Sequence, residues 1–217
     1  MVLKSKKHVF WEALLITIVV FLAGLFLGML VETTNTTKIS NLYLQSEISL
    51  TDAMAAATLS KNTNIDCEAT KNNNIKFADQ VYQEAKLLEE YEESGKLTDS
   101  MTFLHKKYDL LRTLLWTSNQ NSLKRCDNYN LIVYLYEYET EDTETKVTQN
   151  VWSKILLEIK TENHDTLLLP IATDQNLTSL NILIEENKIE KFPALIINND
   201  KILYELDNAS TIYNLLK

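Results

Sequence analysis

The first hydrophobic stretch of this chain is too long and too uniform for a helix of a small soluble domain. Residues from Ala13 to Val31 carry no charge. As a helix rising 1.5 Å per residue, such a segment is about as long as the hydrocarbon core of a bilayer is thick. The pattern predicts a transmembrane helix over residues 9–31. A cleaved signal peptide is the alternative, but its apolar region is shorter and ends at small residues, whereas this one ends in "LFLGMLVETT".

Charges on either side of this span predict its orientation. Lys4, Lys6 and Lys7 precede it, and Glu32 follows it. Positively charged flanks stay in the cytoplasm, so we expect residues 1–8 to be a cytoplasmic tail and everything after the span to be extracytoplasmic. The chain is therefore predicted to be a single-pass membrane protein.

Two glycines, Gly24 and Gly28, lie four residues apart inside the span. Small residues at this spacing let two helix backbones approach closely, which predicts a homodimer contact within the membrane. The alternative is that glycine is simply frequent in membrane helices.

Residues 32–125 repeat apolar side chains at helical spacing. We expect a juxtamembrane helical stalk over residues 32–60, a polar connector over 61–73, and an antiparallel helical hairpin over 74–125, with Gly95 marking the turn. The second helix of the hairpin carries a seam of alternating three- and four-residue steps, made by Met101, Leu104, Tyr108, Leu111 and Leu115.

The hydrophobic period changes near Cys126. Short runs rich in β-branched and aromatic residues predict strands, and segments with helical spacing separate them. The predicted strands are 131–138, "TLLLPIATD", 194–197 and 202–206; the predicted helices contain residues 152–159, 177–184 and 212–216. The element order is β-α-β-α-β-β-α, with a tight turn at "NND" between the last two strands.

This layout resembles the thioredoxin-like family. The segment "TLLLPIATDQNLTSLNILIEENKIEKFPALIINNDKILYELDNASTIYNLL" has the family's order of elements, and Phe192, Pro193 and Ala194 stand where the family places its cis-proline. The resemblance covers about ninety residues, 126–217, and predicts an α/β thioredoxin-like domain after the membrane helix and the helical stalk and hairpin.

The resemblance also implies a binding surface. A cis X-Pro bond turns the chain sharply into the strand, and in the family this place receives an extended peptide. By resemblance, Phe192, Pro193 and Ala194 would line a groove for a protein or peptide partner. A trans proline that merely begins a strand is the alternative.

One departure from the family bears on chemistry. Thioredoxins carry a Cys-x-x-Cys pair at the start of the helix after the first strand, where the helix N-terminus activates a thiol. Here that place is occupied by "EYETEDTETKVTQNVW", which contains no cysteine. We therefore expect no disulfide exchange at the family's site and name no catalytic residue.

The only cysteines, Cys67 and Cys126, lie outside this place. An even count in a translocated chain predicts a structural disulfide between them. Two unpaired thiols and an exchangeable dithiol remain alternatives.

Composition narrows the remaining chemistry. The net charge is −9, and residues 126–217 hold 7 lysines against 16 acidic residues, so nucleic-acid binding is not expected. The three histidines lack metal-ligand spacing, and no glycine-rich phosphate loop lies outside the span. We expect no metal and no cofactor.

Function classes follow from these features. The sequence favours a membrane-anchored extracytoplasmic protein whose redox-inactive domain binds or scaffolds a protein or peptide, rather than an enzyme. One alternative is a thiol-disulfide oxidoreductase or isomerase accessory that uses Cys67 and Cys126. Another is a structural subunit of a membrane assembly.

Overall fold

A computed structural model describes residues 6–62, 66–93, 99–126, 130–206 and 208–216. The chain divides into two compact units, residues 1–44 and 45–217. Gly95 lies outside the described residues, so its expected role as a turn stays a prediction.

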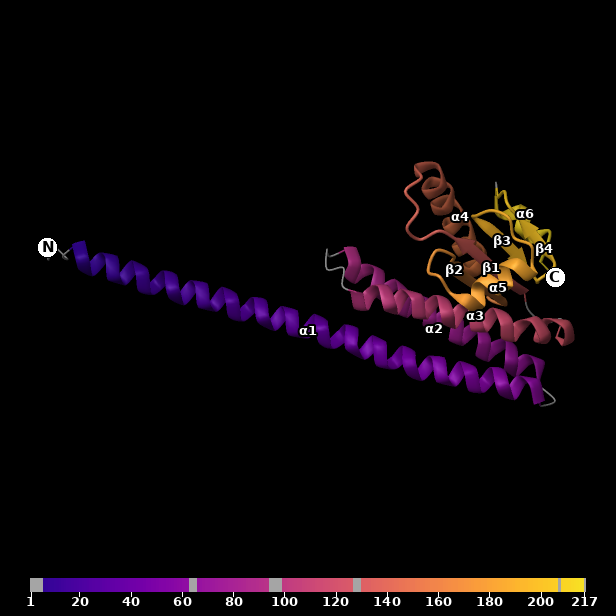
Figure 1. Cartoon of the computed structure of the whole chain (residues 1–217), viewed down its shortest axis with the longest axis horizontal. Helices are drawn as coiled ribbons and strands as arrows, with labels where there is room; N and C mark the ends of the chain where they lie inside the picture. The colour runs from indigo at the N-terminus through magenta and orange to yellow at the C-terminus, as the bar shows by residue number, and fades with distance from the viewer. Residues whose placement is uncertain (1–5, 63–65, 94–98, 127–129, 207, 217) are drawn as a thin grey trace. The chain divides into compact units, whose positions relative to one another are not determined.

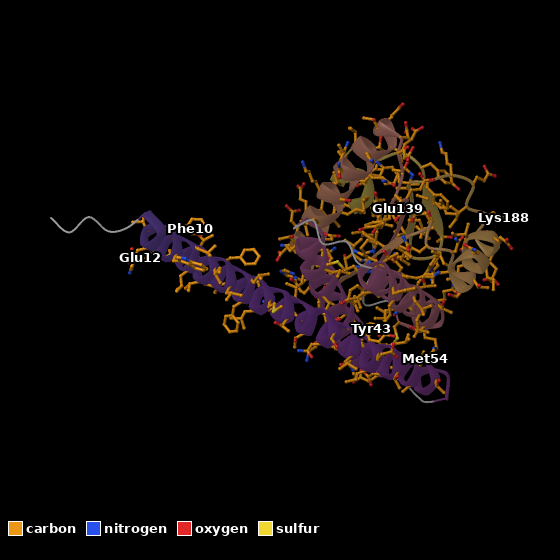
Figure 2. All side chains as sticks on the ribbon, turned by 60° about the vertical axis from the view of Figure 1, so that its left-hand side comes forward. Phe10, Glu12, Tyr43, Met54, Glu139 and Lys188 are labelled. Carbon is orange, nitrogen blue, oxygen red and sulfur yellow. A yellow bond between two sulfur atoms is a disulfide. The ribbon has the colours of Figure 1, made fainter. Side chains whose placement is uncertain are left out.

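The N-terminal unit is the first part of helix α1, Lys6–Asn62, which is continuous across the predicted span and the predicted stalk. Within the described residues, one helix segment, His8–Val31, is long and apolar enough to cross a membrane, and none of its side chains is buried. Figure 2 shows its side chains radiating from the ribbon, with Phe10 and Glu12 near the N-terminal end. Glu12 Oε1 lies 3.2 Å from His8 Nδ1, and Thr17 donates its hydroxyl hydrogen to the Ala13 carbonyl, which satisfies polar atoms that lipid cannot.

Two further helices, α2 (Cys67–Glu93) and α3 (Asp99–Arg125), pack against each other. All five residues of the predicted seam on α3 are buried. Helix α2 begins earlier than expected, within the segment predicted to be a polar connector. The Asp66 carboxylate accepts a hydrogen bond from the Glu68 backbone N–H, which supports this helix start, and a disulfide holds Cys67.

The C-terminal part is a four-stranded sheet with helices, which confirms the general α/β class (Figure 1). Its elements are β1 Asn130–Tyr136, α4 Thr143–Glu162, β2 Thr166–Ala172, α5 Thr178–Glu186, β3 Ala194–Ile197, β4 Lys201–Leu203 and α6 Ala209–Tyr213. The strand order is β2-β1-β3-β4, with β1 parallel to β2 and the other two pairs antiparallel.

Alternation along β1 divides the core into two apolar layers. Leu131, Val133 and Leu135 point into a layer completed by α5 and by α2 and α3. Ile132 and Tyr134 point to the opposite layer, completed by α4 and α6. Both faces of the central strand are therefore covered.

The two edges of the sheet differ. Helices α2 and α3 pack against β2, which lies at one edge and contains Pro170. Proline is tolerated at an edge because it has no N–H to contribute to an inner ladder. Strand β4 is the other edge and has only three residues, a length that limits unwanted pairing with other chains.

Two boundaries differ from the sequence prediction for physical reasons. Helix α4 begins well before the predicted residues because Asp142 caps it. The sequence pattern does not reveal this start, because Val147 and Val151 are exposed and the first turns carry no buried apolar stripe. Strand β4 ends earlier than expected because Leu206 leaves the strand and is buried in the layer beneath α4 and α6.

Helix α5 ends in a Schellman motif at a residue with a left-handed backbone. Lys188 has φ 54° and donates its N–H to the Glu185 carbonyl, while the Ile189 N–H donates to the Ile184 carbonyl.

We predict that Lys188→Gly (Lys188 is labelled in Figure 2) raises the unfolding free energy by about 0.5–1 kcal/mol, since glycine adopts this φ without steric cost. This corresponds to a melting-temperature increase of about 1–4 °C in thermal denaturation of the full chain in detergent.

The matched control is Glu186→Gly, at the last residue of α5. There the backbone is helical, so glycine is expected to lower the melting temperature. A decrease with both variants would contradict the proposed role of the Lys188 backbone.

Candidate functional site

The site predicted at Phe192, Pro193 and Ala194 lies where the chain enters β3. The Phe192–Pro193 peptide bond is cis. Register pairs Ala194 with Leu135, so Pro193 stands beside the C-terminal end of β1, from which the connection to α4 departs. Pro193 and Ala194 are buried, whereas Phe192 is half-buried and packs at the margin of the α5 layer. Of the three predicted residues, Phe192 is the one with a surface to offer a partner.

The segment leading to the cis bond is tied to Tyr204, the residue that follows β4. Tyr204 accepts a hydrogen bond from the Glu190 N–H at 3.2 Å, and the Lys191 ammonium stands 5.4 Å from the Tyr204 ring centroid. The approach to Phe192 is therefore held by contacts to the residue that follows β4.

The connection from β1 to α4 forms the facing part of the site. Gln149 of α4 bonds both backbone groups of Glu137: its Oε1 accepts from the N–H at 2.7 Å, and its Nε2 donates to the carbonyl at 3.0 Å. Asp174 accepts from the Glu139 N–H at 2.7 Å. These side chains, which the sequence analysis did not single out, fix the path of the connection.

A carboxylate caps the start of α4. Asp142 Oδ2 accepts from the Thr145 N–H at 2.8 Å and from the Thr145 hydroxyl at 2.7 Å. These hydrogen bonds hold the pKa of Asp142 below its usual value. The helix N-terminus thus already stabilises one anion, the Asp142 carboxylate.

Behind the site, α3 presents a second buried stripe made of polar residues. Asp109, on this stripe, accepts from the Ala172 N–H at the end of β2 and lies 3.2 Å from Arg112 Nη1. His105, one turn earlier, has its ring 4.9 Å from that of Tyr138 and its Nε2 3.3 Å from the Tyr138 hydroxyl. In the sequence, the i, i+4, i+7 spacing of His105, Asp109 and Arg112 indicates that these polar residues share one face of α3. The stronger apolar seam on the same helix obscured this pattern.

Burial dominates the electrostatics of Asp109. Loss of hydration raises the pKa of its carboxyl from 3.8 to about 6, although Arg112, the Ala172 N–H and His105 all oppose the rise. Burial likewise raises the pKa of the neighbouring Tyr136. Asp109 therefore changes charge in a mildly acidic range.

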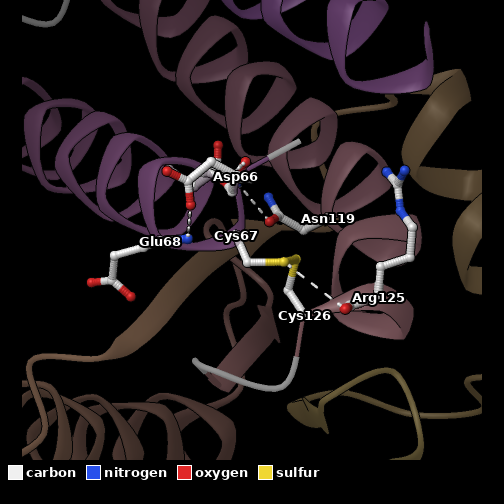
Figure 3. The surroundings of a disulfide bond; sticks show 8 residues. Asp66, Cys67, Glu68, Asn119, Arg125 and Cys126 are labelled. Atoms are coloured by element: carbon white, nitrogen blue, oxygen red, sulfur yellow. Dashed lines mark hydrogen bonds between the residues drawn. A yellow bond between two sulfur atoms is a disulfide. The ribbon is translucent and has the colours of Figure 1, made fainter. Parts of the chain in front are cut away.

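The remaining predicted residues lie elsewhere. Cys67 and Cys126 form a disulfide with Cα atoms 5.5 Å apart, joining the start of α2 to the residue that follows α3 (Figure 3). Gly24 and Gly28 open a shallow groove on α1 with Phe21, Leu25 and Met29, and a Cβ added at either glycine would meet nothing within 4 Å. Among the described side chains, no three His, Cys, Asp or Glu residues group as metal ligands.

Comparison of the chain with protein-family models, with curated proteins and with solved structures finds no match. Its function must therefore be argued from its own geometry.

The Asp109 pKa predicts how stability depends on pH. A carboxyl whose folded pKa exceeds its unfolded pKa binds protons more tightly in the folded state, so its contribution to stability rises as pH falls from about 6 toward 3.8. Between pH 7 and pH 5 we expect the wild type to gain about 1 kcal/mol relative to Asp109→Asn.

Parallel urea titrations of both proteins at the two pH values measure this difference. Asparagine keeps an acceptor for the Ala172 N–H but cannot titrate. Equal pH dependence in the two proteins would contradict the raised pKa.

Proposed function

We propose that this chain is a single-pass membrane protein whose extracytoplasmic, redox-inactive thioredoxin-like domain, residues 126–217, binds an extended segment of a protein partner. The observation that carries the proposal is the half-buried Phe192 ring at the entry to β3, beside the end of β1. The strand order, with α4 and α6 on one face and α5 on the other, supports the thioredoxin-like assignment.

Absence of a thiol from the β1–α4 connection supports binding over redox catalysis. The connection contains no cysteine, and the Asp142 carboxylate occupies the helix N-terminus. A thiolate placed beside a carboxylate loses the electrostatic stabilisation that makes it reactive. This domain would therefore hold a partner without exchanging disulfides with it.

The disulfide supports both the location and a structural role. Disulfide bonds persist in oxidising compartments. Residues 67 and 126 would lie in such a compartment if the basic N-terminus stays in the cytoplasm and the rest of the chain is translocated. The bridge closes a separation of 59 residues, a loop for which the chain-entropy model gives about 4 kcal/mol. Cys126 is buried, which hinders the attack of an external thiolate required for exchange.

Phe192 supplies the contact surface in this proposal. It is half-buried, so a partner's side chain would complete its burial, while a peptide backbone pairs alongside the segment that precedes Pro193. Aromatic side chains that are anchored at their base and open at one edge are typical of binding hot spots.

Site-specific photocrosslinking tests the proposed surface. We expect p-benzoylphenylalanine at position 192 of the full chain, in native membranes, to capture one identifiable protein, with crosslinks mapping to an extended segment of that partner. The matched control places the same photocrosslinker at Phe103, an exposed phenylalanine of α3.

Capture that is equal at 192 and 103 would contradict the proposal.

A separate measurement distinguishes a structural bridge from the alternative of an exchangeable pair. After thiols are trapped in intact cells, we expect Cys67 and Cys126 to be fully oxidised and to remain so in a glutathione buffer of cytosolic potential. Replacing both cysteines with alanine should lower the unfolding free energy by about 2–4 kcal/mol.

Reduced cysteines in intact cells would contradict the extracytoplasmic location. Equilibration with the glutathione buffer would instead favour the oxidoreductase alternative.

A further inference from the structure

A cavity of about 580 Å³ lies beside the sheet. Its volume is in the range of pockets that take small molecules. Its walls come from α2, α3, α4, the end of β1 and strand β2. Phe192, Pro193 and Ala194 do not line it, although Glu137 and Gln149 of the facing β1–α4 connection do. The inference about this cavity does not rest on the function proposed above.

The lining concentrates positive charge within an acidic chain. Four basic side chains reach the cavity from three helices, against two acidic ones, Glu89 and Glu137. The basic residues are Lys86 of α2, Arg112 of α3, and Lys146 and Lys154 of α4. Among the described side chains, the three lysines form no ion pair within 4 Å. Net positive charge in a cleft with protein walls favours an anion.

Arg112 gives the site a buried polar anchor. Its side chain is 8% exposed, and its Nη1 contacts Asp109 at 3.2 Å. A guanidinium has five N–H donors in a planar fork, so pairing with one carboxylate oxygen leaves donors for a second acceptor. Gln149, also buried, contributes an amide to the same lining.

Apolar and aromatic groups form much of the remaining wall, beside the polar Asn150 and Ser153. Tyr82, Tyr136 and Leu157 line the cavity, together with Leu168 and Pro170 of β2. The Tyr136 ring stacks on Tyr134 with ring centroids 5.4 Å apart. Flat walls of this kind suit a planar, apolar body, whereas the basic side chains suit an anionic group attached to it.

We propose that this cavity binds a small organic anion, a carboxylate carried on an aromatic body, with the carboxylate held by Arg112 and the α4 lysines and the ring packed among the tyrosines and Leu157. The anion is either a free small molecule or an acidic residue next to an aromatic one in a peptide, since both present the same chemistry.

Photolabelling of the full chain in lipid nanodiscs with 4-benzoylbenzoate tests this site, because the probe is itself an aromatic carboxylate. We expect saturable labelling at millimolar probe or below, on α2 and α4 peptides that line the cavity. The matched neutral probe, 4-benzoylbenzamide, should label these peptides at least threefold less.

Charge-removing variants then test whether the α4 lysines attract the anionic probe. Lys146→Gln with Lys154→Gln should weaken labelling roughly 3- to 10-fold, the effect expected of two exposed charges at the mouth of a cleft. Lys188→Gln with Lys201→Gln removes the same charge from exposed positions outside the cavity and should leave labelling unchanged. Asn150→Trp, at an exposed cavity-lining position on α4, should abolish labelling by filling the space.

Competition experiments separate the two sources of the anion: 2-naphthoate represents a free small molecule, and an acetylated Glu-Phe dipeptide amide represents a peptide. Reduced photolabelling with either competitor supports the site. Equal labelling by the acid and the amide, equal labelling of the lysine variants and the wild type, or labelling confined to His8–Val31 would overturn the proposal.

Discussion

Burial of β1 on both faces is the constraint on which the C-terminal part depends. Residues 131–135 are fully buried or nearly so, and their side chains alternate between two apolar layers. A strand in this position requires a neighbour on each side and a helix layer on each face, because its backbone groups and both sets of side chains must leave water. Strands β2 and β3 and helices α4 and α5 satisfy these requirements.

The helical hairpin completes this arrangement through polar contacts at its margins. Trp116 of α3 is fully buried, and its indole N–H donates to the Asn199 side chain at 2.7 Å, joining α3 to the turn between β3 and β4. Lys160 of α4 lies 3.1 Å from the Asp79 carboxylate of α2. With the disulfide at the base of both hairpin helices, these contacts explain why the hairpin and the sheet belong to one compact unit.

The same packing separates two surfaces with different chemistry. The cis-proline site lies at the entry to β3 and offers a half-buried aromatic ring within an acidic domain. The basic cavity lies along β2, where α4 and the hairpin approach the strand from different elements. Gln149 connects the two regions, because it orders the β1–α4 connection and also lines the cavity. The two surfaces therefore meet at this connection, whereas Phe192 belongs to the cis-proline site alone.

Local signals in the sequence determined the uncharged span, the order of strands and helices, and strand 194–197, whose observed bounds match the expected ones. They did so because hydrophobic period and turn residues act over a few neighbouring positions. The left-handed turn at Asn198 and Asn199 was also readable from "NND".

Tertiary structure decided what those residues contact. Asn198 bonds the start of β1, Asn199 bonds Trp116, and Asp109 meets the end of β2 across 63 positions of chain. Helices α2 and α4 start earlier than expected because capping side chains, not apolar stripes, define their first residues. Tertiary packing also brings basic residues from three helices together around one cavity. No local period encodes such contacts, because they arise only when distant segments pack together.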